Sequence, residues 1–327
     1  MGTVKEKPKV IIVGHVRHEI PDLLGACCEL QQWRESYDIP PDLWNKWLTD
    51  ADAMVTAGNL VTEDILRQGK KLRVIAQASV GVDNIDLAAC TRYGVPVGNT
   101  PEVLTETTAE LAFTLVACAA RRITEAWDFV RNGQWEQGGF RQSGMDLSRR
   151  TIGIIGMGRI GISISRRAKA FGMTVLYNNR HQRSDDELRC TTYVTKDELL
   201  AQSDVVLVMA PSTPSTYHSI GREEFRKMKN TAIFVNVGRG AIVDTDALVE
   251  ALQHGEIAQA ALDVVEPEPL PKNHPLLQLP NVLIVPHIGS YTKRTRSEMA
   301  QLTARNILNG LDRKPLEACI NSEVNYK

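Results

Sequence analysis

The sequence predicts an α/β protein of two domains, each built on a parallel sheet. Its 327 residues suffice for about two domains that each bury a core. Hydrophobic residues make up 43 % and charged residues 24 %, as is usual for folded soluble proteins. Short β-rich runs alternate with helical stretches along most of the chain, which is the rhythm of βαβ units. These observations exclude a peptide scaffold and a disordered chain.

The first hundred residues contain four predicted strands with Gly or Pro near their ends. These strands are 10–13, 53–55, 74–77 and 95–97. A long helix follows from Thr107, because Thr107 and Glu110 have the spacing of a capping box and apolar residues repeat along one face. This helix is expected to end near 121–122.

Beyond a polar stretch at 133–144 the alternation resumes and predicts a second parallel sheet. Its strands are 151–155, 175–177, 205–209, 233–236, 260–264 and 283–285. A last helix, about 292–310, is expected to return the chain to the first domain. We therefore assign residues 1–100 with 293–327 to one domain and residues 101–292 to the other.

The net charge and the spacing of the cysteines limit which kinds of partner and which compartment we expect for this protein. With 38 Lys and Arg against 39 Asp and Glu, the net charge of −1 offers no general attraction to nucleic acid or anionic lipid. The longest mostly apolar run, 111–120, is too short to cross a bilayer. Six cysteines without CxxC spacing indicate reduced thiols and a cytoplasmic protein. We expect no nucleic-acid partner, no membrane partner and no metal site.

A G-x-G-x-x-G sequence lies between a predicted strand and a predicted helix, the context in which it binds dinucleotides. Gly156 permits the tight turn, Gly158 lets the backbone approach a pyrophosphate, and Gly161 lets helix and strand pack closely. The helix N-terminus at Arg159 and Ile160 would face the anion.

The end of the next strand suggests which dinucleotide binds. A carboxylate there would accept hydrogen bonds from the ribose of NAD, but the chain has Asn178, Asn179 and Arg180. Because Arg offers charge-assisted donors and no carboxylate repels a dianion, Asn179 and Arg180 favour a 2′-phosphate. NADPH is the expected cofactor, with NADH as the alternative if Arg180 is only a solvated surface charge.

Three residues that could reduce a 2-oxo acid each follow a predicted strand, where ligands of open α/β sheets bind. Arg239 can hold a carboxylate and polarise a carbonyl. His287 can supply the proton that a ketone oxygen needs as hydride reaches its carbon. Glu268 would favour the imidazolium and fix its tautomer.

This combination resembles the D-isomer-specific 2-hydroxyacid dehydrogenase family over nearly the whole chain. The matching motifs are 79–83, 107–111, the glycine turn, 235–240, 262–270 and 286–290. Within the family the chain is most similar to the glyoxylate/hydroxypyruvate reductases, especially at 268–276 and 287–290.

The resemblance implies two Rossmann-like or flavodoxin-like domains with the active site in the cleft between them. It implies NADPH-dependent reduction of glyoxylate or hydroxypyruvate to glycolate or D-glycerate, with His287 as general acid. It also implies a homodimer built largely on the coenzyme domain. In the animal reductases, the segment 136–146 carries several aromatic residues. Here it has only Phe140, so the preferred 2-oxo acid stays open.

The family positions add further site residues. Val80 and Gly81 would offer backbone N–H groups to the substrate carboxylate, with Ser290 near the substrate. Three more residues would line the nicotinamide and ribose region, namely Pro211, Val237 and Asp263.

Two alternatives remain at this stage. The same chemistry could act on another substrate, such as 2-ketogluconate or 3-phosphoglycerate. The family also includes nucleotide-sensing corepressors, which keep the fold and bind partner proteins, since a fold does not determine a function.

Overall fold

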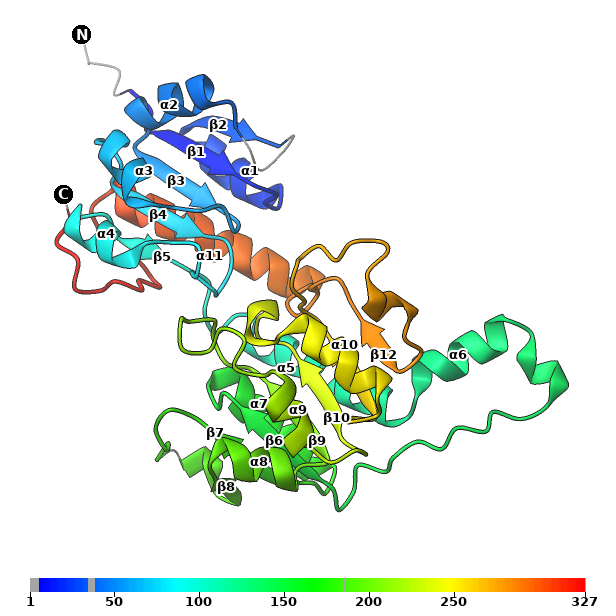
Figure 1. The fold of residues 1–327 in the computed structure, drawn as a ribbon. Coiled ribbons are helices and arrows are strands. Elements are labelled where there is room, and N and C mark those ends of the chain that lie inside the picture. The colour runs from blue at the N-terminus through cyan, green and yellow to red at the C-terminus, as the bar shows by residue number, and fades with distance from the viewer. Residues whose placement is uncertain (1–5, 35–38, 185, 327) are drawn as a thin grey trace, which may run out of the picture. The chain divides into compact units, whose positions relative to one another are not determined.

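The computed structural model describes residues 6–34, 39–184 and 186–326, and the chain forms two compact units (Figure 1). One unit runs to Leu104 and resumes at Tyr291, and the other is Thr105–Ser290. Each unit is an α/β structure on a parallel sheet, so the predicted fold class of each is confirmed.

The first unit has a five-stranded parallel sheet in the order β2-β1-β3-β4-β5. Its strands are β1 (Lys9–Val13), β2 (Glu29–Trp33), β3 (Ala53–Thr56), β4 (Val74–Gln77) and β5 (Val97–Gly98). Its helices are α1 (Glu19–Gly25), α2 (Pro41–Asp50), α3 (Glu63–Gln68), α4 (Leu87–Arg92) and α11 (Lys293–Leu311).

Alternate residues of these strands supply two separate cores, as a sheet covered on both faces requires. Val10 and Ile12 pack with α1 and α11 on one face. Ile11 and Val13 pack with α2, α3 and α4 on the other. The last helix therefore completes the first unit although it follows the second unit in sequence.

The second unit has a seven-stranded parallel sheet in the order β12-β11-β10-β9-β6-β7-β8. Its strands are β6 (Thr151–Ile155), β7 (Thr174–Asn178), β8 (Thr191–Tyr193), β9 (Val205–Val208), β10 (Ile233–Asn236), β11 (Gln259–Leu262) and β12 (Val282–Ile284). Its α-helices are α5 (Thr105–Ala120), α6 (Ile123–Arg131), α7 (Arg159–Ala170), α8 (Lys196–Gln202), α9 (Arg222–Lys227) and α10 (Thr245–Gln253). Short 3₁₀ turns are η1 (Gln134–Gln137), η2 (Asp186–Leu188), η3 (Gly240–Ile242) and η4 (Pro275–Gln278).

Two cores again lie on opposite faces of the sheet. Ile152 and Ile154 of β6 pack with α5 and α7. Val206 and Val208 of β9 pack with α8, α9 and α10, where the fully buried Phe225 and Phe234 meet edge to face at 5.3 Å. These cores hold the strand ends that carry the site.

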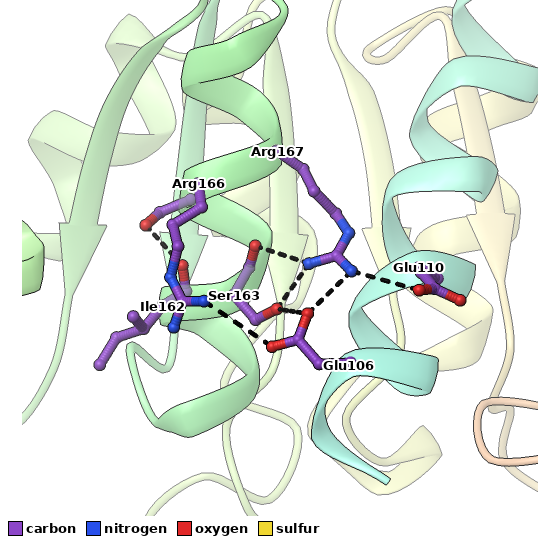
Figure 2. A network of polar contacts seen from close by, with 7 residues as sticks. Glu106, Glu110, Ile162, Ser163, Arg166 and Arg167 are labelled. Atoms are coloured by element: carbon purple, nitrogen blue, oxygen red, sulfur yellow. Dashed lines mark hydrogen bonds and ion pairs between the residues drawn. The ribbon is translucent and has the colours of Figure 1, made fainter. Parts of the chain in front are cut away.

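A polar network joins α5 to α7, the helix that follows the glycine turn (Figure 2). The Arg167 guanidinium lies 2.9 Å from the Glu106 carboxylate and donates to the Ser163 hydroxyl at 2.6 Å, and Ser163 donates to Glu106 at 2.9 Å. The hydrogen bonds from Arg167 and Ser163 hold the pKa of Glu106 below its ordinary value. The network stabilises α7 against its neighbour.

Several elements differ from the predictions. The edge strands β2 and β8 were not predicted, because Glu29–Trp33 is largely polar and Thr191–Tyr193 has three residues. The capping box at Thr107 is wrong, since α5 begins at Thr105. Only Val97 of the predicted strand 95–97 lies in β5, which ends at Gly98. Helix α6 was also missed; it follows Arg122, which has left-handed backbone (φ 52°).

None of the helices in the described part of the chain is long and apolar enough to cross a membrane. All six cysteines are free thiols.

Candidate active site

The glycine turn joins β6 to α7, and two of its glycines have no room for a side chain. Gly156 has φ +103°, and a Cβ there would lie 2.5 Å from the backbone nitrogen of Ala210. A Cβ on Gly161 would lie 2.7 Å from the Gly156 carbonyl oxygen. Gly158, the N-cap of α7, faces open space instead. The turn therefore presents an accessible helix N-terminus, which suits the pyrophosphate of a dinucleotide.

The predicted residues beside this turn lie close to its backbone. Asn179 accepts a hydrogen bond from Met157 N at 2.6 Å and donates one to Met157 O at 3.2 Å. Arg180 is exposed, as is Arg159 in the first turn of α7, and Ile160 is half-buried. The Asn179 side chain thus ties the glycine turn to the end of β7.

Arg183 was missed by the sequence analysis and also approaches the turn. Its guanidinium donates to Met157 O at 3.4 Å. The available signal was a second arginine three residues after Arg180. Both cations follow β7, where the adenosine ribose of a dinucleotide is expected.

Pro211 and Val237, which we expect near the nicotinamide, follow β9 and β10. Pro211 is exposed, and its carbonyl accepts a hydrogen bond from the Thr216 hydroxyl at 2.8 Å. Val237 is buried and donates its N–H to Val208 O at 3.1 Å.

Arg239, Glu268 and His287 follow β10, β11 and β12, which are consecutive neighbours in the sheet. Because these strands are parallel, their carboxyl ends meet at one edge. The positive charge of Arg239 disfavours protonation of both Glu268 and His287. The structure therefore groups the three residues that the sequence singled out.

His287 and Glu268 form a hydrogen-bonded pair, with Nδ1 lying 2.7 Å from Oε1. The side chains are 51 % and 41 % exposed, so both solvent and a ligand can reach them. The Glu268 carboxylate raises the pKa of His287 above its ordinary value. Burial alone would raise the pKa of Glu268, but the bond from His287 keeps it below the usual value. A carboxylate only accepts hydrogen bonds, so Nδ1 carries a proton and Nε2 faces away from Glu268.

A buried carboxylate supports the turn that carries His287. Asp263 is 3 % exposed and accepts hydrogen bonds from Ile288 N at 2.6 Å and Gly289 N at 3.0 Å. Burial raises the pKa of Asp263, and these two N–H groups oppose the rise. His287 itself has φ +51°, an uncommon conformation for a residue with a side chain. Asp263 thus holds the backbone of the turn that carries His287, and its predicted cofactor contact stays a prediction.

The loop of Val80 and Gly81 belongs to the first unit and is held by side-chain amides. Asn99 donates to Val80 O at 2.8 Å, and Gln77 donates to Gly81 O at 3.1 Å. Because the Val80 carbonyl shares a peptide plane with the Gly81 N–H, the bond from Asn99 fixes the direction of that N–H group. Ser290 is half-buried in the second unit.

A dinucleotide turn followed by Arg, Glu and His at adjoining strand ends defines an oxidoreductase that binds a nicotinamide cofactor. The family model described as "D-isomer specific 2-hydroxyacid dehydrogenase, NAD binding domain" matches residues 113–289. The chain belongs to this family.

Similar proteins carry related names. The chain is 41 % identical to a glyoxylate reductase of Thermococcus gammatolerans, with 97 % of each chain covered. It is also 41 % identical to glyoxylate/hydroxypyruvate reductase B of Pectobacterium atrosepticum, over 97 % of this chain and 99 % of the relative. Among solved structures, an NADPH-dependent glyoxylate/hydroxypyruvate reductase of Sinorhizobium meliloti in complex with NADP and malonate matches with TM-score 0.89 and 30 % identity, covering 98 % and 99 % of the two chains.

Proposed function

We propose that this protein reduces glyoxylate and hydroxypyruvate to glycolate and D-glycerate with NADPH. The observation that carries the proposal is the His287–Glu268 pair at 2.7 Å, with Arg239 on the neighbouring strand end. The names of the relatives at 41 % identity support the substrate class.

In this proposal the chain's residues handle the substrate carboxylate and the proton. NADPH supplies the hydride that bonds to the carbonyl carbon. Arg239 holds the carboxylate through two parallel N–H bonds and polarises the carbonyl. His287 donates the Nε2 proton to the carbonyl oxygen as negative charge develops there. Glu268 keeps the imidazole protonated and oriented until that transfer.

Further binding roles follow from position. The N–H groups of Val80 and Gly81 bind the carboxylate, and Ser290 lies near the substrate. The proposed substrate domain is 1–100 with 293–327, and the proposed coenzyme domain is 101–292.

Cofactor contacts are assigned to the second unit. The glycine turn, at Gly156, Gly158 and Gly161, would hold the pyrophosphate together with Arg159 and Ile160, the first residues of α7. Asn179, Arg180 and Arg183 would bind the 2′-phosphate, while Pro211, Val237 and Asp263 would line the nicotinamide and its ribose.

The homodimer is proposed to use an arm formed by residues 121–147, which includes α6 and η1 and extends away from the sheet (Figure 1). Trp127 and Trp135 are 62 % and 67 % exposed, and Ile123 and Val130 are exposed as well. Exposed aromatic residues are typical of protein interfaces. Light scattering should give twice the chain mass. The free thiols support a cytoplasmic location.

The test measures the loss of 340 nm absorbance as purified protein oxidises NADPH or NADH. The four substrates compared are hydroxypyruvate, glyoxylate, 2-ketogluconate and 3-phosphohydroxypyruvate. Fast NADPH oxidation with hydroxypyruvate and glyoxylate supports the proposal. Preference for 2-ketogluconate or 3-phosphohydroxypyruvate would replace the substrate, and preference for NADH would remove the role of Arg180. Binding of NADPH without turnover of any of the four would favour a nucleotide-sensing switch.

A further inference from the structure

A second imidazole–carboxylate pair lies among the loops that follow the strands of the second unit. His218 Nε2 is 2.6 Å from Glu266 Oε2, and the side chains are 36 % and 35 % exposed. The ring of Tyr217 stacks on the His218 ring at 4.0 Å, with an interplanar angle of 12°. Glu266 and Tyr217 are thus the titratable groups in contact with this imidazole.

The backbone of His218 is left-handed, with φ +45°, close to the +51° of His287. Such a conformation is uncommon in a residue with a side chain and persists where surrounding contacts impose it. Two histidines of this unit, each paired to a glutamate, therefore share the same uncommon geometry.

His218 connects the segments that carry two of the three proposed catalytic residues. Its backbone N–H donates to Ala241 O at 2.9 Å, two residues beyond Arg239. Its imidazole bonds to Glu266, two residues before Glu268. Pro267 lies between Glu266 and Glu268, and its restricted φ limits how freely the two residues move relative to one another.

The same two segments are also in direct contact. A Cβ on Gly240 would overlap the carbonyl oxygen of Val265, so the Arg239 turn lies directly against the start of the Glu268 segment. The Thr245 hydroxyl donates to Glu266 O at 2.7 Å. Contact through Gly240 brings the segments together, and His218 bridges them from the loop that follows β9.

We propose that His218 is a positioning residue that, through Glu266, holds the Glu268 segment in register with the Arg239 turn. This inference rests on the proposed function for its kinetic consequences. The His218–Glu266 pair acts on the position of the catalytic groups and adds little to the stability of the fold, because both side chains are exposed by more than a third. Small displacements of catalytic groups, in contrast, cost large factors in rate.

Steady-state kinetics of four variants test the role. H218A and E266A should each lower kcat/KM about 10- to 100-fold, whereas H218Q, which keeps an N–H donor, should retain most of the activity. The double variant H218A/E266A should lose no more than the worse single variant, because both remove one interaction. H254A, in an exposed histidine at the end of α10, is the matched control and should behave as wild type. Unchanged kcat/KM in H218A, or single losses that multiply in the double variant, would overturn the proposal.

A pH profile separates positioning from general loosening of the fold. Glu268 and Asp263 raise the pKa of His287, and Arg239 opposes them. If H218A displaces Glu268, that pKa falls, and the alkaline limb of kcat/KM for reduction moves to lower pH. If the role of His218 is merely structural, H218A should lower thermal stability and cofactor affinity and leave the alkaline limb in place. That result would contradict the proposal.

The third readout does not depend on turnover. The ring pKa of His287 can be measured by NMR with ¹⁵N-histidine, its signal assigned from the spectrum of H287Q. It should be lower in H218A than in wild type and unchanged in H254A; an equal value in H218A refutes the positioning role. If wild type reduces no 2-oxo acid, the proposed function fails while this measurement still decides the role of His218.

Discussion

Nδ1 of His287 lies 2.7 Å from Oε1 of Glu268, although 19 residues separate them in the chain. Their segments leave adjacent parallel strands, β11 and β12, at the same edge of the sheet. The pairing raises the pKa of His287, so more of the imidazole is protonated near neutral pH than in a free histidine. An acid in that state suits reduction of a carbonyl.

Replacing the proposed general acid should abolish reduction without abolishing nucleotide binding. H287Q is expected to lower kcat for hydroxypyruvate about 10²- to 10⁴-fold, because no group then donates the proton. NADPH affinity, measured by calorimetry, should change little, since the glycine turn lies in a different loop. H254Q serves as control, and wild-type turnover in H287Q would refute the mechanism.

Removing the partner carboxylate should change the pH dependence. In E268Q the hydrogen bond to a charged acceptor is lost, so the pKa of His287 falls towards or below its ordinary value. Reduction requires the protonated form, which exists below that pKa. The alkaline limb of kcat/KM should therefore move to lower pH, measured from pH 5 to 9. A limb in its wild-type place would mean that Glu268 does not control the acid.

The guanidinium at position 239 should not be replaceable by an ammonium. R239K keeps the charge and loses the planar pair of donors, so KM for the 2-oxo acid should rise and kcat should fall. About 10-fold or more in kcat/KM is expected from loss of one charge-assisted bond. R226K, on the exposed face of α9, is the matched control. Equal kinetics for R239K and wild type would exclude bidentate binding.

Two arginines after β7 should determine the preference for NADPH. The double variant R180A/R183A is expected to lower kcat/KM with NADPH about 10-fold or more, because a phosphate dianion loses charge-assisted donors. The value with NADH should change little. The exposed Arg189, which directly follows η2, supplies the control R189A. A parallel loss with both cofactors would show that the arginines support the fold instead.

The network between α5 and α7 should contribute a small pH-dependent stability (Figure 2). The pKa of Glu106 is lower folded than unfolded, so its contribution is present above the ordinary value of 4.5 and is lost as pH falls through the lower folded value. Because the side chain is 50 % exposed, E106Q should cost less than about 1 kcal/mol at pH 7.

Urea unfolding at pH 7 and below pH 4 measures this difference. E6Q, in an exposed residue before β1, should be neutral at both pH values. A larger loss at the lower pH would contradict the assigned sign.

The sequence alone determined the two parallel sheets and the place of the candidate catalytic residues in them. Buried parallel strands are continuous apolar runs, so β6, β9 and β10 stand out, and residues just after them must lie at one sheet edge. Gly156 could be assigned because the geometry it serves is local. The edge strands β2 and β8 could not be predicted. Their burial, and hence their pattern of apolar residues, depends on neighbours that the local sequence does not specify.

Which side chains of distant loops meet is visible only in the folded chain. His218 and Glu266 are 48 residues apart, and His218 lies outside every motif, so their bond depends on how three loops pack. The role of Asp263 in bonding the turn of His287 and the approach of Arg183 to Met157 arise in the same way. Strand order follows from periodic patterns that every residue of a strand reinforces. A contact between two loops depends on a few bonds whose geometry exists only after the sheet has formed.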